Sequence, residues 1–89
     1  MVRYRVVFGG KFEKELKKLD TMAARRIAEW IRINLVDTDD PWRYAKAMRG
    51  EYEGMYRYRI GDYRVIVKIE QEEVAIICLT VGHRREVYR

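Results

Sequence analysis

The sequence predicts one small α+β domain over residues 1–89, in which a helical hairpin packs on a sheet. Three observations predict this class. Residues 3–8 alternate in the manner of a strand, residues 11–35 carry apolar side chains at helical spacing, and from Met55 onward the apolar period becomes two. We therefore expect an N-terminal strand, a helical hairpin and a three-stranded antiparallel meander, all strands forming one small sheet.

The first half of the chain supplies the strand and the helical hairpin. Gly9 and Gly10 end the first expected strand. The first expected helix, "KFEKELKKLD", has its apolar residues at helical spacing: Phe12, Leu16 and Leu19. Asp20 or Thr21 is expected to cap a second helix. The apolar stripe of that helix consists of Ala24, Ile27, Ala28, Ile31 and Leu35, flanked by Trp30, for which we favour a core position.

The second half supplies the meander. Pro41 cannot continue a helix, and Tyr44 to Met48 are expected to form a short helical turn. The period of two then predicts strands at residues 55–60, 63–70 and 74–82. The last of these strands is almost wholly apolar ("VAIICLTVG"), so we expect it in the interior of the sheet with both faces covered.

Composition narrows the class of protein. Lys and Arg number 19 against 14 Asp and Glu, which gives a formal net charge of +5 and favours a polyanionic partner such as nucleic acid, an anionic membrane or an acidic protein. The one cysteine, Cys78, excludes an intramolecular disulfide, and no Cys/His group has metal-ligand spacing, so we expect no metal and no cofactor. No apolar run is long enough for a signal peptide or a membrane span. We expect a cytoplasmic protein without a membrane role.

Positive charge is concentrated on the segment "MYRYRIGDYRVIV", where Gly61-Asp62 fits a two-residue type II′ turn. In that register Ile60 opposes Tyr63, and Arg59 opposes Arg64. Because side chains alternate across a strand, Arg57 joins these two arginines on one face, and the tyrosines take the other. Opposed like charges are destabilising by a few tenths to about 1 kcal/mol.

Two interpretations of these arginines remain open. The first is a solvated basic face without a ligand. The second is a phosphate cradle, because guanidinium groups bind phosphate oxygens in bidentate geometry. The C-terminal segment "GHRREVYR" adds a near-neutral titrating group, a phenol and further cations that could fold back to this face.

Four segments in this order carry a resemblance: "FEKELKKLD", "AMRGEYEG", "YRYRIGDYRVIV" and "VGHRREVY". Together they resemble the RelE group of the RelE/ParE toxin superfamily over nearly the whole chain. The resemblance implies a toxin of a type II toxin–antitoxin system that enters the ribosomal A site and cleaves mRNA there. It also implies in-line attack of the ribose 2′-oxygen on the adjacent phosphate, with a 2′,3′-cyclic phosphate and a 5′-hydroxyl as products.

The resemblance also implies which residues act. Arg57 and Arg59 match the two basic positions before the turn, and Arg64 matches the arginine after it. Arg84 matches the arginine of the "G-basic-R" element, and Tyr88 matches the tyrosine near the end of the chain. The candidate RNA-binding residues are Arg57, Arg59, Arg64, Arg85 and Arg89.

This chain departs from well-studied relatives, which have lysines where it has Arg57 and Arg59. Arginine has a pKa above about 12 and does not act as a general base. The proton must therefore be moved by another group, and His83 and Tyr88 are the candidates. A structural role for His83 stands equally open, and Tyr88 could instead stack on a base.

Two other functions remain as alternatives. A ParE-like gyrase poison shares the fold but generally lacks the cleavage residues. A non-catalytic RNA-binding or ribosome-binding module would use the same arginines without cutting. As partners, the resemblance implies an acidic RelB-like antitoxin, the ribosome with its mRNA, and operator DNA only for the toxin–antitoxin complex.

Overall fold

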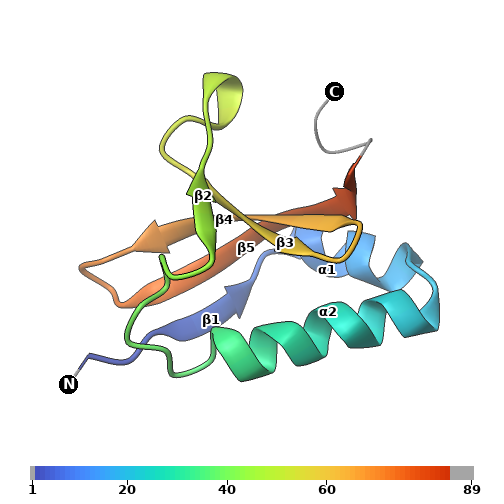
Figure 1. Ribbon diagram of the computed structural model, residues 1–89, viewed down its shortest axis with the longest axis horizontal. Helices are drawn as coiled ribbons and strands as arrows, with labels where there is room; N and C mark the ends of the chain where they lie inside the picture. The colour runs from blue at the N-terminus through green and yellow to red at the C-terminus, as the bar shows by residue number, and fades with distance from the viewer. Residues whose placement is uncertain (1, 85–89) are drawn as a thin grey trace.

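A computed structural model of the chain describes residues 2–84 and has the expected α+β class. The helices and strands follow in this order: β1 (Arg5–Phe8), α1 (Gly10–Lys18), α2 (Thr21–Asn34), β2 (Ala45–Ala47), the 3-10 helix η1 (Gly50–Tyr52), β3 (Tyr56–Ile60), β4 (Tyr63–Glu70) and β5 (Ala75–His83). The strands form a single sheet in the order β1-β5-β4-β3-β2, with the helical hairpin on one side of it (Figure 1).

The sheet combines one parallel pair with an antiparallel meander. β1 runs parallel to β5, with Val6 opposite Ile76 and Phe8 opposite Cys78. β2, β3, β4 and β5 pair antiparallel with their neighbours. A bulge beside Ile66 adds one residue to β5, and it allows β5 to keep apolar side chains toward the core on both sides of the irregularity.

Each helix is positioned by a local signal in the sequence. Of the two expected caps for α2, the structure uses Asp20, whose side chain accepts a hydrogen bond from the Ala23 N–H at 2.9 Å. The stripe of α2 buries Ile27, Ile31 and the following Leu35. Ala28, which was expected in that stripe, is exposed.

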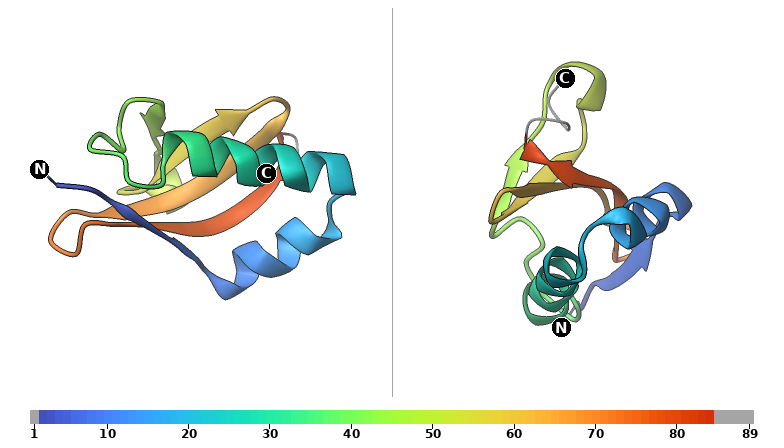
Figure 2. Two further views of the ribbon diagram at one scale, coloured as in Figure 1. Left: turned by 90° about the horizontal axis from the view of Figure 1, so that it is seen from below. Right: turned by 90° about the vertical axis from the view of Figure 1, so that its right-hand side faces the viewer.

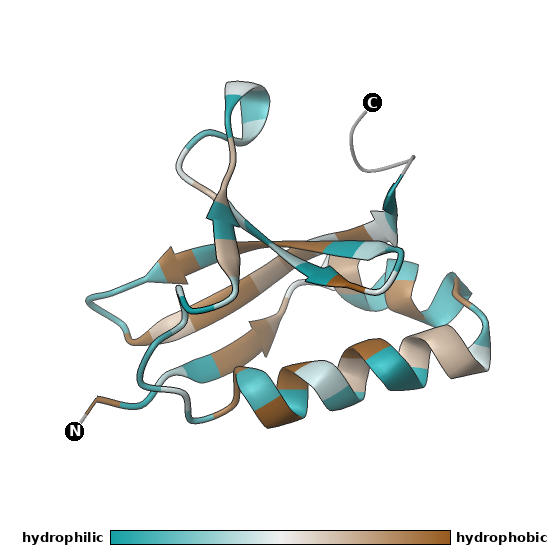
Figure 3. Ribbon diagram, viewed as in Figure 1, coloured by the Kyte–Doolittle hydropathy of each residue, from teal (hydrophilic) through white to brown (hydrophobic). Residues whose placement is uncertain are grey.

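The core lies between the helices and one face of the sheet, as the views of Figure 2 show. It comprises Tyr4, Phe12, Ile27, Ile31, Leu35, Tyr58, Ile60, Val65, Val67, Ile76, Cys78 and Val81. Trp30 packs at its margin, with its ring centroid 5.3 Å from that of Tyr58. Apolar residues accordingly predominate on β4, β5 and β1 in Figure 3, whereas β3 is largely polar.

Two expectations about the sheet were wrong. The segment from Tyr44 to Met48 contains the short strand β2 instead of a helical turn, so the sheet has a fifth strand. Alanine and lysine favour helices locally, but pairing with the backbone of β3 decides the outcome. β5 lies inside the sheet as expected, but both helices cover the same face, and Ile77 on the opposite face is only half-buried.

Three hydrogen bonds, which involve the side chains of Glu15 and Tyr58, hold the sheet to its surroundings. Beyond the end of β1, α1 covers the outer edge of β5. Glu15 Oε1 of α1 accepts hydrogen bonds there from the Thr80 hydroxyl at 2.6 Å and the Val81 N–H at 3.0 Å. The buried Tyr58 hydroxyl donates to the Pro41 carbonyl oxygen at 2.5 Å. Burial raises the pKa of this hydroxyl, so it stays protonated and remains a donor. Within residues 2–84, no helix has the length and apolar character needed to cross a membrane.

Replacing Tyr58 by phenylalanine tests the hydrogen bond to Pro41. The change keeps the ring in the core but leaves a buried carbonyl oxygen without its donor, so we expect the free energy of unfolding to fall by about 1–3 kcal/mol. Urea unfolding followed by tryptophan fluorescence measures this change. Tyr44→Phe is the control: its side chain is 53% exposed, and a change within about 0.5 kcal/mol is expected. Equal effects of the two substitutions would contradict the prediction.

Candidate functional site

The turn between β3 and β4 sets the geometry of the basic residues. Gly61 has a φ of 59°, and Asp62 is not among the residues with positive φ, which is the pattern of a type II′ turn. The register therefore pairs Ile60 with Tyr63 and Arg59 with Arg64, as the sequence predicted. A slip of one residue would turn the apolar side chains of both strands away from the core.

Three arginines share the face of the sheet that carries no helix. Tyr58, Ile60 and Val65 point into the core on the helix side. Since side chains alternate along a strand, the neighbouring residues Arg57, Arg59 and Arg64 project from the opposite face. We call these three residues the arginine face.

Exposure differs strongly within the arginine face. Arg59 is exposed and Arg57 is half-buried, whereas Arg64 is only 4% exposed. A cation that is removed from water attracts a nearby anion more strongly, because the effective dielectric constant around it is lower. The face thus offers one accessible guanidinium and one shielded guanidinium directly opposite each other.

Two segments rise from the sheet on the side of the arginine face. One is the connection of residues 48–55 with η1, and the other is the end of β5 (Figures 1 and 2). At the end of β5, the N–H of Arg84 donates to the Asp62 carbonyl oxygen at 2.8 Å. This bond holds the backbone of the exposed Arg84 beside the β3–β4 turn, close to the strand ends that carry Arg59 and Arg64.

The structure does not bring His83 to the arginine face. His83 pairs with Tyr63, and their rings meet edge to face with centroids 5.6 Å apart and an interplanar angle of 79°. Tyr63 packs against the core on the helix side, so its cross-strand partner lies on that side as well. Arg85, Tyr88 and Arg89 lie outside the described residues, and their roles stay predictions.

The sequence analysis gave no role to Lys46, a basic residue on this side of the sheet. Lys46 of β2 pairs directly with Arg57 of β3, so it projects from the same side of the sheet. It was missed because its segment was expected to be a helical turn. The signal in the sequence is weak: one lysine between two alanines that turn toward the core side.

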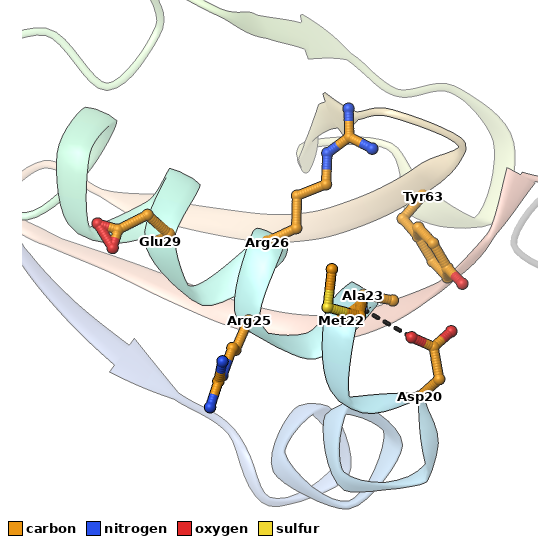
Figure 4. Close-up of a pocket in the computed structure, with 7 residues that line it drawn as sticks. All are labelled: Asp20, Met22, Ala23, Arg25, Arg26, Glu29 and Tyr63. Atoms are coloured by element: carbon orange, nitrogen blue, oxygen red, sulfur yellow. Dashed lines mark hydrogen bonds between the residues drawn. The ribbon is translucent and has the colours of Figure 1, made fainter.

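A groove of about 730 Å³ lies elsewhere, on the helix side of the β3–β4 turn (Figure 4). Its lining residues are Asp20, Met22, Ala23, Arg25, Arg26, Glu29 and Tyr63. Arg26 extends from α2 toward the turn, and a Cβ added at Gly61 would lie 3.1 Å from its Cζ. Gly61 is favoured by its positive φ, and a side chain there would also displace the Arg26 guanidinium by a few tenths of an ångström.

The arginine face can bind and neutralise a phosphate, but it does not supply a base. Guanidinium groups donate several hydrogen bonds in a fixed planar fork, which matches phosphate oxygens, and they keep their protons at neutral pH. Among residues 2–84, no three His, Cys, Asp or Glu side chains gather in a way that could hold a metal ion. The chemistry that this geometry offers is electrostatic stabilisation of a reacting phosphodiester.

Comparisons with known proteins agree with this fold. A family model described as the ParE toxin of type II toxin–antitoxin system, parDE, matches residues 6–88. The chain is 30% identical to Toxin RelG of Mycobacterium tuberculosis over 86 residues, which cover 97% of each chain. It is similar to a chain of the RelBE2 toxin–antitoxin complex of the same organism, with a TM-score of 0.78, 29% identity and 97% of each chain covered. For the archaeal RelE–RelB complex of Pyrococcus horikoshii OT3, the TM-score is 0.71 and the identity 28%, with 97% of this chain and 99% of the other covered.

Arg59→Thr tests whether the opposed arginines oppose folding. The substitution removes the repulsion across the Arg59–Arg64 pair, so we expect the free energy of unfolding to rise by a few tenths to about 1 kcal/mol in low salt. Urea unfolding at two salt concentrations measures it, and the gain should shrink at high salt because screening weakens the repulsion.

Lys68→Thr is the matched control for this measurement. It introduces the same strand-favouring residue, but Lys68 forms an ion pair with Glu70 at 3.2 Å, so no gain from relieved repulsion is expected. A loss of stability in Arg59→Thr, or an equal gain in both variants, would contradict the prediction.

Proposed function

The chain belongs to the ParE toxin family of type II toxin–antitoxin systems, and from this premise we propose that it is a ribosome-dependent endoribonuclease that cleaves mRNA in the A site. The observation that carries the proposal is the hairpin register that gathers Arg57, Arg59 and Arg64 on the sheet face without helices. Two arginines opposite each other on neighbouring strands are a destabilising pair. A site for a phosphodiester would make use of them, since negative charge develops there during cleavage.

The proposed reaction needs no cofactor. The ribose 2′-oxygen loses its proton and forms a bond to the adjacent phosphorus, while the bond from phosphorus to the 5′-oxygen of the next nucleotide breaks. The leaving 5′-oxygen takes up a proton, and the products are a 2′,3′-cyclic phosphate and a 5′-hydroxyl. The pentacoordinate transition state carries more negative charge than the starting phosphodiester, so fixed cations stabilise it more than they stabilise the ground state.

Each arginine has a proposed role in this step. Arg64, shielded from water and opposite Arg59, would form with it a clamp on the non-bridging oxygens of the scissile phosphate. Arg57 would extend the positive charge along β3, beside this clamp. Arg84, whose backbone is fixed beside the turn, would neutralise the leaving side of the phosphate.

Proton transfer is assigned to groups other than arginine. Tyr88 stays the preferred candidate from the sequence for contact with the RNA, either as a proton carrier or by stacking on a base. His83 lies on the helix side of the sheet and packs on Tyr63, so its proposed role is structural. With little acid–base equipment on the arginine face, the enzyme would depend on the ribosome to hold the mRNA in the in-line geometry, which lowers the entropic part of the barrier.

The family name leaves one further function to be tested. A toxin of the ParE type would inhibit gyrase and leave mRNA intact. The full set of arginines favours RNA cleavage, and the two activities differ in their first effect in cells. Rapid arrest of translation supports mRNA cleavage, whereas DNA breaks with an SOS response support gyrase inhibition.

An antitoxin is the proposed protein partner. Two of the similar solved structures are complexes of a RelE-type toxin with its antitoxin, RelBE2 and archaeal RelE–RelB. The net charge of +5 on this chain suits an acidic, RelB-like partner that folds as it binds. Binding of operator DNA would belong to the complex of the two proteins.

Mapping of cut sites tests the proposed activity. In a purified translation system, we expect the wild-type protein to cut translated mRNA at A-site codons and to leave the same RNA intact when ribosomes are absent. Arg59→Thr should lower the cleavage rate by about 10²- to 10³-fold, the usual loss for one charge-stabilising donor, although the variant is expected to be the more stable protein. Primer extension of the RNA gives both the sites and the rates.

Arg5→Ala is the matched control for cleavage. It removes one arginine from a strand of the same sheet, but β1 is separated from β3 by two strands. Its cleavage rate should stay within about twofold of the wild type. Efficient cutting of RNA without ribosomes, or equal rates for Arg59→Thr and the wild type, would refute this mechanism.

A further inference from the structure

The short strand β2 places a lysine beside the arginine face. Lys46 is directly opposite Arg57, while its neighbours Ala45 and Ala47 pair with Tyr58 and Tyr56 on the core side. Paired residues on antiparallel strands project from the same face with their Cβ atoms about 4.5–5.5 Å apart. Lys46 therefore stands next to Arg57 on the side of the sheet without helices.

The surroundings of Lys46 leave its charge available. Its side chain is exposed and forms no ion pair with another residue of the range 2–84. Lys68 on β4 provides a contrast, because it is also exposed but is held by Glu70 at 3.2 Å. Of these two strand lysines, Lys46 is the one whose ammonium group is not already neutralised by a described carboxylate.

The position of β2 separates Lys46 from the opposed arginines. β2 is the edge strand, and β4 lies two strands away, so about 10 Å separates the backbones that carry Lys46 and Arg64. A phosphate clamped between Arg59 and Arg64 is thus farther from Lys46 than from Arg57. A nucleic acid chain, however, presents a second charged phosphate one nucleotide away.

We propose that Lys46, together with Arg57, forms a second phosphate subsite that binds the phosphate next to the scissile one in the substrate RNA. This inference rests on the proposed function and adds to it a positioning residue that the sequence analysis did not contain. Lysine suits the role, because a compact ammonium group on a flexible stem acts as a point charge and makes few demands on geometry. The subsite would fix the register of the mRNA across β2 and β3, and the arginines opposite each other would act on the bond that breaks.

Removing the subsite should weaken binding and leave the chemical step intact. For Lys46→Ala we expect KM for programmed ribosomes to rise about 2- to 5-fold with kcat within about twofold of the wild type. The dependence of log affinity on log salt should become less steep by about 0.7, the value for one phosphate contact on a single strand. Lys46→Arg should restore the wild-type KM and the wild-type salt dependence, since it keeps the charge. Lys68→Ala is the matched control and should change neither KM nor the salt dependence.

The decisive experiment neutralises the RNA phosphates one at a time. Ribosomes are programmed with three mRNAs, each with a 2′-O-methyl group at the cleavage position that blocks the reaction. One mRNA keeps its natural phosphates, and each of the other two has a methylphosphonate at one of the two phosphates that flank the scissile one. Binding of the wild type, Lys46→Ala and Lys68→Ala is measured on each mRNA. If the subsite exists, one methylphosphonate abolishes the loss caused by Lys46→Ala, because the two changes remove the same contact.

The outcomes separate this inference from the proposed function. If the wild type cuts translated mRNA and Lys46→Ala weakens binding equally on all three mRNAs, the subsite is refuted and the proposed nuclease stands. An unchanged affinity of Lys46→Ala refutes the subsite in the same way. If the wild type neither binds programmed ribosomes nor cuts mRNA, the proposed function falls and the subsite with it. Coupling to one flanking phosphate, absent for Lys68→Ala, establishes the subsite.

Discussion

The register of the β3–β4 hairpin is the constraint on which the site depends. A glycine with positive φ at position 61 fixes a two-residue turn, and every pairing along the two strands follows from it. With this register the tyrosines and valines fill the core and the arginines share the other face. Folding and the placement of charge are therefore one event: the burial of apolar side chains under the helices holds like charges opposite each other against their repulsion.

The one-sided cover of the sheet makes such an arrangement possible. Both helices lie on the same face, so the main core forms there, and the second face carries arginines beside the buried Ile66 (Figure 2). Guanidinium groups on that face differ in their contact with water, from the exposed Arg59 to the shielded Arg64. The face thus combines an accessible guanidinium group with one whose electric field is less screened by water.

Much of this molecule could be predicted from its sequence, because its strongest local signals agree with the final fold. The period-two pattern and the Gly61-Asp62 turn gave the hairpin register, and helical spacing with the Asp20 cap gave α2. β2 could not be predicted, since an alanine-rich tripeptide becomes a strand only by pairing with β3. Lys46 was missed for the same reason. The face of the sheet on which His83 lies depends on how β5 pairs with β4. The burial of Arg64 depends on tertiary packing, which no local sequence pattern reports.

The parallel pairing of β1 with β5 has a consequence for the order of folding. Arg5 lies opposite Ala75 and Phe8 opposite Cys78, so β1 finds its partner only when a strand much further along the chain has been made. Closing so long a loop is entropically unfavourable until the hairpins between the two ends have formed. A nascent or truncated chain without β5 lacks the neighbour of both β1 and β4, so the intact sheet cannot form before β5 is present. β1 is therefore a strand that can join the sheet only after β5 has been made.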